Sequence, residues 1–290
     1  MFWEAAHAGA EAGANLTGTS IYWNAPTRED DVEGQIALVD RIVNDGYEGL
    51  VLAPDQALSL ISPVRRALAR HIPTVILGSP LPIPPGGDLS YILIDDEQGG
   101  RMAADRAAAL MKGHGTVALL GINSDIVGIM VRARTFEQTL ARDAPGIRIV
   151  AKRMGTFNAA HEQQAVEDVL RANPNLDLIV ALMGPTLDGS LAALEGKPDD
   201  RRIKVIGFDA VGGPPFHQRV SLDSVVQGNT RAMAQQAVIL ISQKRAGQLT
   251  PVLIRVPPKL ICRNNVDSAE IHQMLSGDWT LGRSPWSSTQ

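Results

Sequence analysis

The stretch Lys204-Val-Ile-Gly-Phe-Asp209 decides the fold of this chain, because it combines a short buried strand with a carboxylate at the strand's end. Three of its residues are apolar, and Gly207 leaves room for another element to pack closely against the strand. The loop that follows, Ala-Val-Gly-Gly-Pro-Pro, continues neither a strand nor a helix. Ligands of open parallel sheets bind outside the carboxyl ends of the strands, so Asp209 is the best-placed polar group for a ligand contact. The alternative is that Asp209 only caps a turn or the next helix.

Strands and helices alternate along most of the chain. Apolar runs bounded by turn residues predict strands at 19–23, 49–53, 73–77, 91–94, 116–120, 148–154, 178–182, 204–208, 223–227, 252–256 and 260–262. Helical periods of about ten to fifteen residues separate most of them, which predicts βαβ units and parallel sheets. The fold class is therefore α/β. One doubly wound sheet is possible, but two sheets of five or six strands fit 290 residues better.

The composition narrows the functional classes. The chain is 44% hydrophobic and 20% charged, with a formal net charge of −4 and no basic stripe, so we expect no nucleic-acid partner. Its single cysteine, Cys262, excludes an internal disulfide and a cysteine-based metal site. No apolar run reaches the length of a membrane span, and no signal peptide follows Met1, so we expect no membrane insertion.

Motifs for catalysis are missing from the sequence. There is no phosphate-binding loop and no nucleophile elbow, and the six histidines are dispersed without metal-ligand spacing. The pair Gly99-Gly100 opens a helix without the dinucleotide fingerprint, which indicates close packing. Asp95-Asp96, just before that helix, is expected to cap it. We therefore expect no enzyme activity, no cofactor and no bound metal.

Six short motifs follow one another in a distinctive order. They are Phe2-Trp3 with Gly9-Ala10, Ile94-Asp-Asp-Glu-Gln-Gly-Gly-Arg101, the helical segment from Arg132 to Phe136, the strand that ends at Asp209, the next strand that ends at Gln227, and Leu260-Ile-Cys-Arg-Asn-Asn-Val266. In this order and spacing, over about residues 2–266, the chain resembles the type I periplasmic binding proteins of the ribose/galactose class. These proteins are related to the effector domains of LacI-type repressors.

The resemblance implies two Rossmann-like lobes joined by a three-strand hinge, with a small-molecule ligand in the cleft between them. Lobe one would comprise residues 1–95 and 229–255, and lobe two residues 96–228 and 256–276, followed by a loose tail at 277–290. A ligand that contacts both lobes would favour their closed state. The implied partners are a sugar-like molecule and the permease subunits of an ABC-type importer. We expect a monomer in the periplasm or cell envelope.

The resemblance also implies roles for individual residues. Phe2 and Trp3 would stack on the apolar face of a sugar ring, and Phe157 would contribute from the second lobe. Asp209 and Gln227 would form hydrogen bonds with hydroxyl groups. The alternative for Phe2 and Trp3 is core packing of the first helix.

Several family positions are changed in this chain. The family's cleft-facing arginine falls on Met130 and its second-lobe asparagine on Met183, while Ala53 and Gly78 stand where the sugar binders carry polar residues. Candidates to replace the lost groups are Asp55, Ser79, Asp125, Asn158 and Arg132. A sugar hydroxyl left without a partner costs roughly 1–3 kcal/mol. Three such losses would remove much of a micromolar affinity, about 8 kcal/mol. We therefore expect a less polar ligand, such as a deoxy or modified sugar or a ring-bearing amine or alcohol.

The family pattern begins with a strand and a short loop, whereas this chain starts inside that pattern at Met1. We expect the first lobe to lack one central strand and to be less stable than the second, with an export signal and the first strand lost upstream. The leading hypothesis is the solute-binding protein of an ABC-type importer. The alternatives are a ligand-sensing effector domain of a LacI-type regulator or chemoreceptor, and an α/β enzyme.

Overall fold

The computed structural model describes residues 3–28, 31–197, 202–210 and 213–278, which belong to two compact units. Unit 1 consists of Met1–Ile94, Asn229–Val256 and Met274–Gln290, and unit 2 of Asp95–Gly228 and Pro257–Gln273. The chain therefore passes from one unit to the other four times. The lobe boundaries expected from the sequence differ by one residue at two of these passages and agree at a third, between residues 228 and 229. Residues 274–276 differ more, because they belong to unit 1, and the tail from 279 onward lies outside the described residues.

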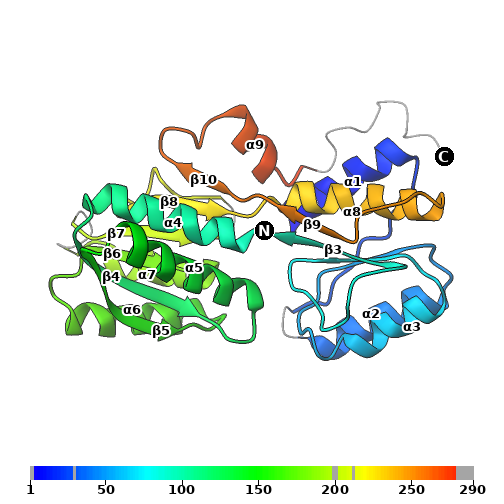
Figure 1. The fold of residues 1–290 in the computed structure, drawn as a ribbon, viewed down its shortest axis with the longest axis horizontal. Coiled ribbons are helices and arrows are strands. Elements are labelled where there is room, and N and C mark those ends of the chain that lie inside the picture. The colour runs from blue at the N-terminus through cyan, green and yellow to red at the C-terminus, as the bar shows by residue number, and fades with distance from the viewer. Residues whose placement is uncertain (1–2, 29–30, 198–201, 211–212, 279–290) are drawn as a thin grey trace. The chain divides into compact units, whose positions relative to one another are not determined.

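Unit 1 contains a parallel four-stranded sheet with helices on its faces (Figure 1). Its elements are α1 (Glu4–Thr17), α2 (Val32–Asn44), β1 (Leu50–Leu52), α3 (Ile61–Ala69), β2 (Thr74–Leu77), β3 (Leu89–Ile94), α8 (Thr230–Arg245) and β9 (Leu253–Val256). The strands are arranged in the order β1-β2-β3-β9, and every neighbouring pair is parallel. Helices α1 and α8 lie side by side, as do α2 and α3.

Unit 2 contains a six-stranded sheet in the order β10-β8-β7-β6-β4-β5. Its elements are α4 (Asp96–Met111), β4 (Gly115–Ile122), α5 (Val127–Asp143), β5 (Ile147–Met154), α6 (Ala159–Ala172), β6 (Leu178–Ala181), α7 (Gly184–Leu194), β7 (Lys204–Phe208), β8 (Leu222–Gln227) and β10 (Lys259–Cys262). Only β10 runs antiparallel to its neighbour. The predicted α/β class with parallel sheets is thus confirmed.

Strand β7 lies in the middle of the core of unit 2. Val205, Ile206 and Phe208 are at most 1% exposed, because helices cover both faces of the sheet. A β-carbon added at Gly207 would lie 2.6 Å from the Leu187 side chain of α7. The sequence-based expectation of close packing at this glycine is therefore confirmed, and the contact explains why β7 has no side chain at that position.

Glycines also allow neighbouring helices to approach closely in both units. In unit 2, a β-carbon at Gly100 of α4 would lie 2.6 Å from the carbonyl oxygen of Arg132 in α5, which confirms the predicted close packing. In unit 1, a β-carbon at Gly9 of α1 would overlap the carbonyl group of Arg231 in α8. The Asp95 carboxylate caps α4 as expected, accepting a hydrogen bond from the Gln98 N–H at 2.9 Å.

Two sequence-based predictions of local structure were wrong. The strand predicted at 19–23 does not form, and β1, the nearest strand of the unit 1 sheet, pairs only with β2 among the described residues. No element was expected beyond the strand predicted at 260–262, but the structure has α9 (Ala269–Leu275) there. Ile271 and Met274, three positions apart on α9, are buried, so the helix exists because this short apolar stripe finds a surface to cover.

Candidate functional site

The carboxyl edge of the unit 2 sheet brings together most of the residues that the sequence selected there. Strands β8, β7, β6, β4 and β5 are consecutive neighbours and all run parallel, so their carboxyl ends meet at one edge. Gln227 ends β8, Asp209 follows β7, Met183 begins the turn into α7, and Phe157 lies in the turn after β5. This edge is where parallel sheets bind their ligands.

Arg132 connects two carboxylates at this edge. Its Nε donates to Oδ1 of Asp96 at 2.5 Å, and its Nη1 donates to Oδ2 of Asp209 at 2.6 Å and to the carbonyl oxygen of Leu182 at 3.2 Å. The guanidinium also lies over the ring of Phe208, with Cζ 4.8 Å from the ring centroid. The cluster of two carboxylates and one guanidinium therefore carries a formal charge of −1.

Burial shapes the electrostatics of this cluster. The side chain of Arg132 is 8% exposed, and those of Asp96 and Asp209 are 13% and 16% exposed. Burial opposes the charge on Arg132, but Asp209 and Asp96 together raise the pKa of its guanidinium above the usual range, so it stays charged. Burial raises the pKa of Asp96, and the adjacent Arg132 opposes that rise.

Asp209 has an unusual backbone conformation. Its φ is +52°, in the left-handed region that aspartate and asparagine tolerate better than most residues. Its second carboxylate oxygen, Oδ1, accepts a hydrogen bond from the N–H of Gly228 at 3.2 Å. Each carboxylate oxygen can accept two hydrogen bonds, so both retain acceptor capacity beyond these contacts. Asp209 is thus fixed in place and still able to bind a hydroxyl or amine.

Gln227 contributes an unsatisfied polar atom to the same edge. The residue is 3% exposed, and its Oε1 is buried without a hydrogen-bond partner among the described residues. A buried carbonyl oxygen without a partner costs about 1–3 kcal/mol, so such atoms are uncommon in folded proteins. Oε1 is closed to solvent in this conformation, so a ligand would recover this cost only by donating a hydrogen bond after the Gln227 side chain turned towards it.

Apolar side chains accompany the polar ones. Met130 on the first turns of α5 is 41% exposed and Phe157 is 66% exposed, so both offer apolar surface to solvent. Met183 is buried and lies against Gly121 and Gly155, where its side chain supports the loop that carries Phe157.

A buried carboxylate that the sequence analysis missed holds the Phe157 loop in place. Glu162 is 2% exposed, and its Oε1 accepts hydrogen bonds from the N–H and the hydroxyl of Thr156 at 2.5 and 3.0 Å. Its Oε2 accepts a bond from the Thr186 hydroxyl of α7 at 2.6 Å. The signal in the sequence is weak, because Glu162 reads as an ordinary residue in the first turn of α6. Asn158, a candidate ligand contact, instead caps α6 by accepting from the His161 N–H at 3.1 Å.

The candidates in unit 1 lie at the carboxyl ends of β1 and β2 and at the start of α1. Trp3 precedes the first turn of α1 and is 39% exposed, while Asp55 is exposed and Ser79 half-buried. Gln35 of α2, which the sequence analysis did not select, fixes the loop after β1. Its Nε2 donates to the carbonyl oxygen of Ala53, and its Oε1 accepts from the Asp55 N–H, both at 2.9 Å. Phe2 lies outside the described residues.

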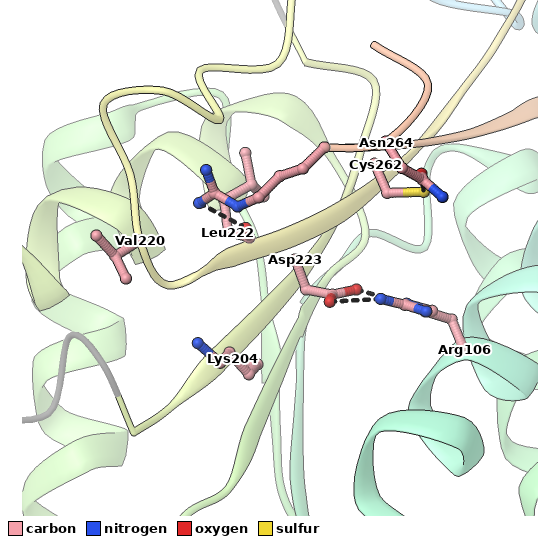
Figure 2. A pocket seen from close by; sticks show the side chains of 8 residues that line it. Arg106, Lys204, Val220, Leu222, Asp223, Cys262 and Asn264 are labelled. Carbon is pink, nitrogen blue, oxygen red and sulfur yellow. Dashed lines mark hydrogen bonds and ion pairs between the residues drawn. The ribbon is translucent and has the colours of Figure 1, made fainter.

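A hollow of about 280 Å³ in unit 2 lies at the opposite end of the strands (Figure 2). Nε and Nη2 of Arg106 each donate a hydrogen bond to one oxygen of the Asp223 carboxylate, both at 2.7 Å. The thiol of Cys262 donates to Oδ1 of Asn264 at 3.0 Å. Burial raises the pKa of this thiol, so it remains protonated and poorly nucleophilic near neutral pH.

Two further observations limit the chemistry. Within the described residues, no group of three or more histidine, cysteine, aspartate or glutamate side chains is placed to hold a metal ion. None of the described helices combines the length and the apolar character needed to cross a lipid bilayer.

Comparison with known proteins identifies relatives. The family model described as a periplasmic binding protein domain matches residues 1–213. The D-ribose/D-allose-binding protein of Pseudomonas aeruginosa is 23% identical over 193 residues, which cover 63% of this chain and 58% of that protein. The xylitol-binding protein of Mycolicibacterium smegmatis is 24% identical, covering 70% of this chain and 57% of that protein. The matched regions thus span less than two thirds of both relatives. The D-allose-binding periplasmic protein of Escherichia coli is 23% identical over 87% of this chain and 83% of its own length.

Solved structures show the same fold. A carbohydrate transporter solute-binding protein from Agrobacterium radiobacter, in complex with D-arabinose, superposes with a TM-score of 0.82 at 22% identity, covering 95% of this chain and 94% of that one. A sugar-binding protein of a sugar ABC transporter from Bacillus halodurans superposes with a TM-score of 0.85 at 20% identity, covering 92% and 94%.

Proposed function

Because the chain belongs to the periplasmic binding protein domain family, we propose that it binds a sugar or sugar-like small molecule for an ABC-type importer. The observation that carries the proposal is the fixed carboxylate of Asp209. Arg132 and the Gly228 N–H hold it at the carboxyl edge of the unit 2 sheet while leaving acceptor capacity for a ligand. Relatives named for ribose, allose and xylitol support the same class of ligand.

We propose that the ligand is less polar than ribose, such as a deoxy or modified sugar or a ring-bearing amine or alcohol. Met130 and Phe157 present apolar surface at the edge where Asp209 offers an acceptor and Gln227 holds a second acceptor that is buried. An apolar ring face would cover these side chains, while one or two donors of the ligand would reach the acceptors. Trp3, Asp55 and Ser79 are proposed as the contribution of unit 1.

Binding in this proposal requires no bond to be made or broken. The place of action is the periplasm or cell envelope, and the partners are the permease subunits of the importer. The hinge closure and the monomeric state implied by the resemblance stay predictions. Small-angle scattering with and without ligand tests both, because closure reduces the radius of gyration while the molecular mass stays that of one chain.

The decisive experiment is a thermal-shift screen followed by calorimetry. The panel contains pentoses, hexoses, deoxy sugars and ring-bearing amines and alcohols, and we expect a deoxy sugar or a ring-bearing amine or alcohol to raise the melting temperature most. Asparagine tolerates the left-handed backbone conformation as aspartate does, so Asp209→Asn removes the negative charge without straining the backbone. A hydrogen bond to a charged group contributes about 1.5–3 kcal/mol, so this variant should bind about 10- to 100-fold more weakly.

The matched control is Asp105→Asn, which removes an exposed carboxylate on α4 away from the sheet edge. It should bind as the parent does. The proposal fails if no member of the panel stabilises the protein, or if Asp209→Asn binds as tightly as the parent.

A further inference from the structure

Acidic groups outnumber basic ones among the buried charges at the carboxyl edge of the unit 2 sheet. Glu162 is buried, and the side chains of Asp96 and Asp209 are mostly buried. Arg132 is the only basic side chain that is buried in the described part of the chain. We call these four residues the edge cluster. Three carboxylates and one guanidinium give the edge cluster a formal charge of −2.

Glu162 has no basic partner. Its Oε1 accepts from Thr156, which follows β5, and its Oε2 accepts from Thr186 at the start of α7, so the carboxylate lies at the same edge as Asp209. No ion pair joins Glu162 to a lysine, an arginine or a histidine of the described residues. Charged side chains are almost never fully buried unless they are paired, so an unpaired buried carboxylate is unusual.

Hydrogen-bond donors hold the carboxylates in their charged form. Three donated hydrogen bonds reach Glu162, and Asp209 accepts one from Arg132 and one from a backbone N–H. Such bonds favour the ionised form of a carboxyl group. Burial raises the pKa of Asp96, and protonation of Asp96 would still leave the edge cluster with a charge of −1. The negative excess therefore does not depend on Asp96.

Other charged groups near this edge do not cancel the excess. Arg101 forms an ion pair with Glu97 of the same helix, with 2.6 Å between Nη1 and Oε1. Arg153 near the end of β5, Asp125 after β4 and His161 in the first turn of α6 are exposed. Solvent and salt screen the field of exposed charges more strongly than that of buried ones. The field at this edge is therefore dominated by the edge cluster.

Helix ends at this edge act first on the carboxylates. Helix α4 begins at Asp96, and Glu162 lies in the first turn of α6. The positive end of a helix dipole stabilises a carboxylate in its first turn and weakens beyond that turn. These two helix ends thus help to keep the carboxylates ionised. Helices α5 and α7 begin without a side-chain cap, so an anionic ligand is the alternative that an experiment must exclude.

Asp209 is the member of the edge cluster best able to contact a ligand. Its side chain is the most exposed of the three acids, and both carboxylate oxygens retain acceptor capacity. The charge of Arg132 is already matched by two carboxylates, so a bound anion would be a further negative group beside one guanidinium. Phe157 is exposed and uncharged at the same edge, and the face of an aromatic ring attracts cations.

We propose that the ligand of this site carries a protonated amine, as an amino sugar or a ring-bearing amine does, and that its ammonium group donates to Asp209. This chemical class rests on the proposed function, because it describes the molecule that the same site binds. An ammonium group donates in three directions and reduces the excess charge of the edge cluster, whereas a neutral hydroxyl leaves that charge unchanged. Glu162 acts through its charge rather than by contact, because it is only 2% exposed.

The test compares molecules that differ mainly in charge. The probes are D-glucosamine, D-glucose, N-acetyl-D-glucosamine and D-glucuronate, the corresponding galactose series, and the pair 4-aminocyclohexanol and 1,4-cyclohexanediol. Calorimetry is carried out at about pH 7, where an amine with a pKa near 8 is mostly protonated. Hydrogen bonds between charged groups are roughly twice as strong as neutral ones, so each amine should bind at least about tenfold more tightly than its neutral counterparts. For the amino sugars, this preference should disappear at about pH 10, where the amine has lost its proton.

Glu162→Gln separates the charge of Glu162 from its structural role. Glutamine keeps the size of the side chain and an acceptor for Thr156, and its amide can donate to the Thr186 hydroxyl. The variant should bind the amines several-fold more weakly and the neutral sugars as the parent does. Asp105→Asn is the matched control, because it makes the same change in net charge at an exposed position of α4. It should leave both affinities unchanged.

The possible failures are distinguishable. Neutral sugars that bind as tightly as the amines would overturn the charge preference and leave the proposed function standing. A glucuronate that binds more tightly than glucosamine would overturn it in favour of an anionic ligand. An equal loss of amine and neutral-sugar affinity in Glu162→Gln would show that this residue acts only by holding the Phe157 loop. The absence of binding by every probe would overturn both the amine and the proposed function. The pH series on the parent protein decides the outcome if the variant does not fold.

Discussion

Nη1 of Arg132 donates to Oδ2 of Asp209 over 2.6 Å, and this bond links the start of α5 to the end of β7. The same guanidinium donates to Asp96 at the start of α4, so one side chain fixes three element ends. Asp209 has a φ of +52°, and its carboxylate is held by Arg132 and by the N–H of Gly228. Arg132 is therefore a positioning residue for the proposed ligand contact.

Replacing Arg132 with methionine should destabilise the protein. The substitution keeps most of the side-chain volume but leaves Asp96 and Asp209 buried without their cation, which costs about 3–5 kcal/mol. Urea unfolding measures the loss. Arg134→Met is the matched control, because Arg134 lies two positions further along α5 and is exposed. The free energy of unfolding of this control should change by no more than about 0.5 kcal/mol. Equal stability of the two variants would contradict the assigned role.

The loss in free energy of unfolding caused by Arg132→Met should depend on pH. Burial raises the pKa of Asp96 and Arg132 opposes the rise, so removing Arg132 raises that pKa further. The folded variant then binds protons that the unfolded chain releases, and its free energy of unfolding increases as the pH falls from 7 towards about 4. Unfolding curves of parent and variant at several pH values test this. A difference in free energy of unfolding between parent and variant that stays constant across this pH range would show that the carboxylates do not take up protons.

Gln227→Met should separate stability from binding. The substitution removes a buried oxygen that has no partner among the described residues, so the ligand-free variant should be as stable as the parent or more stable. Ligand-induced stabilisation should fall, because the ligand loses an acceptor. Thermal shift with and without ligand measures both. Ser224→Ala is the control, since its buried hydroxyl on β8 also lacks a partner there, and it should leave binding unchanged.

Alkylation of Cys262 should be slow and should become faster at high pH. Burial has the largest effect on the pKa of the Cys262 thiol and raises it; Arg106 lowers this pKa and Asp223 raises it. The thiol of the folded protein should therefore react at a higher pH than that of the unfolded chain. Iodoacetamide rates between pH 7 and 10, followed by mass spectrometry, test this. Asp223→Asn should lower the apparent pKa, because Arg106 then acts without the opposing carboxylate. A parent thiol more reactive than the unfolded chain would refute the account.

The sequence predicted features that depend on local pattern. Alternating apolar runs and helical periods are sufficient for the α/β class, and Gly207 in β7 predicted a close contact whose partner, Leu187, the structure identifies. The strand predicted at 19–23 failed because strand formation requires a neighbour, and a run of residues carries no information about whether that neighbour is present. Helix α9 was missed because a seven-residue segment with two buried apolar residues is too short to show a helical period.

The residues that end the strands of the candidate site could be predicted from the sequence, but the contacts between their side chains could not. Asp209 and Gln227 could be selected because they end neighbouring strands. The ion pair of Arg132 with Asp96 joins residues 36 positions apart, and the bonds of Glu162 reach across to α7. Such contacts depend on side-chain directions in the folded protein, which no single-sequence pattern encodes. Whether these residues contact a ligand stays a prediction.

The discontinuity of unit 1 has a consequence for synthesis of the chain. Helix α1 packs on α8, and β9 closes the unit 1 sheet only at Val256, whereas residues 95–228 already supply five of the six strands of unit 2. At ~5–20 residues per second, the ribosome needs about 10 to 50 s to extend the chain from the end of α1 to that point. During this interval the alanine-rich face of α1 lacks its partner. Helix α1 is therefore made early and packs late, whereas most of unit 2 can pack as soon as it is made.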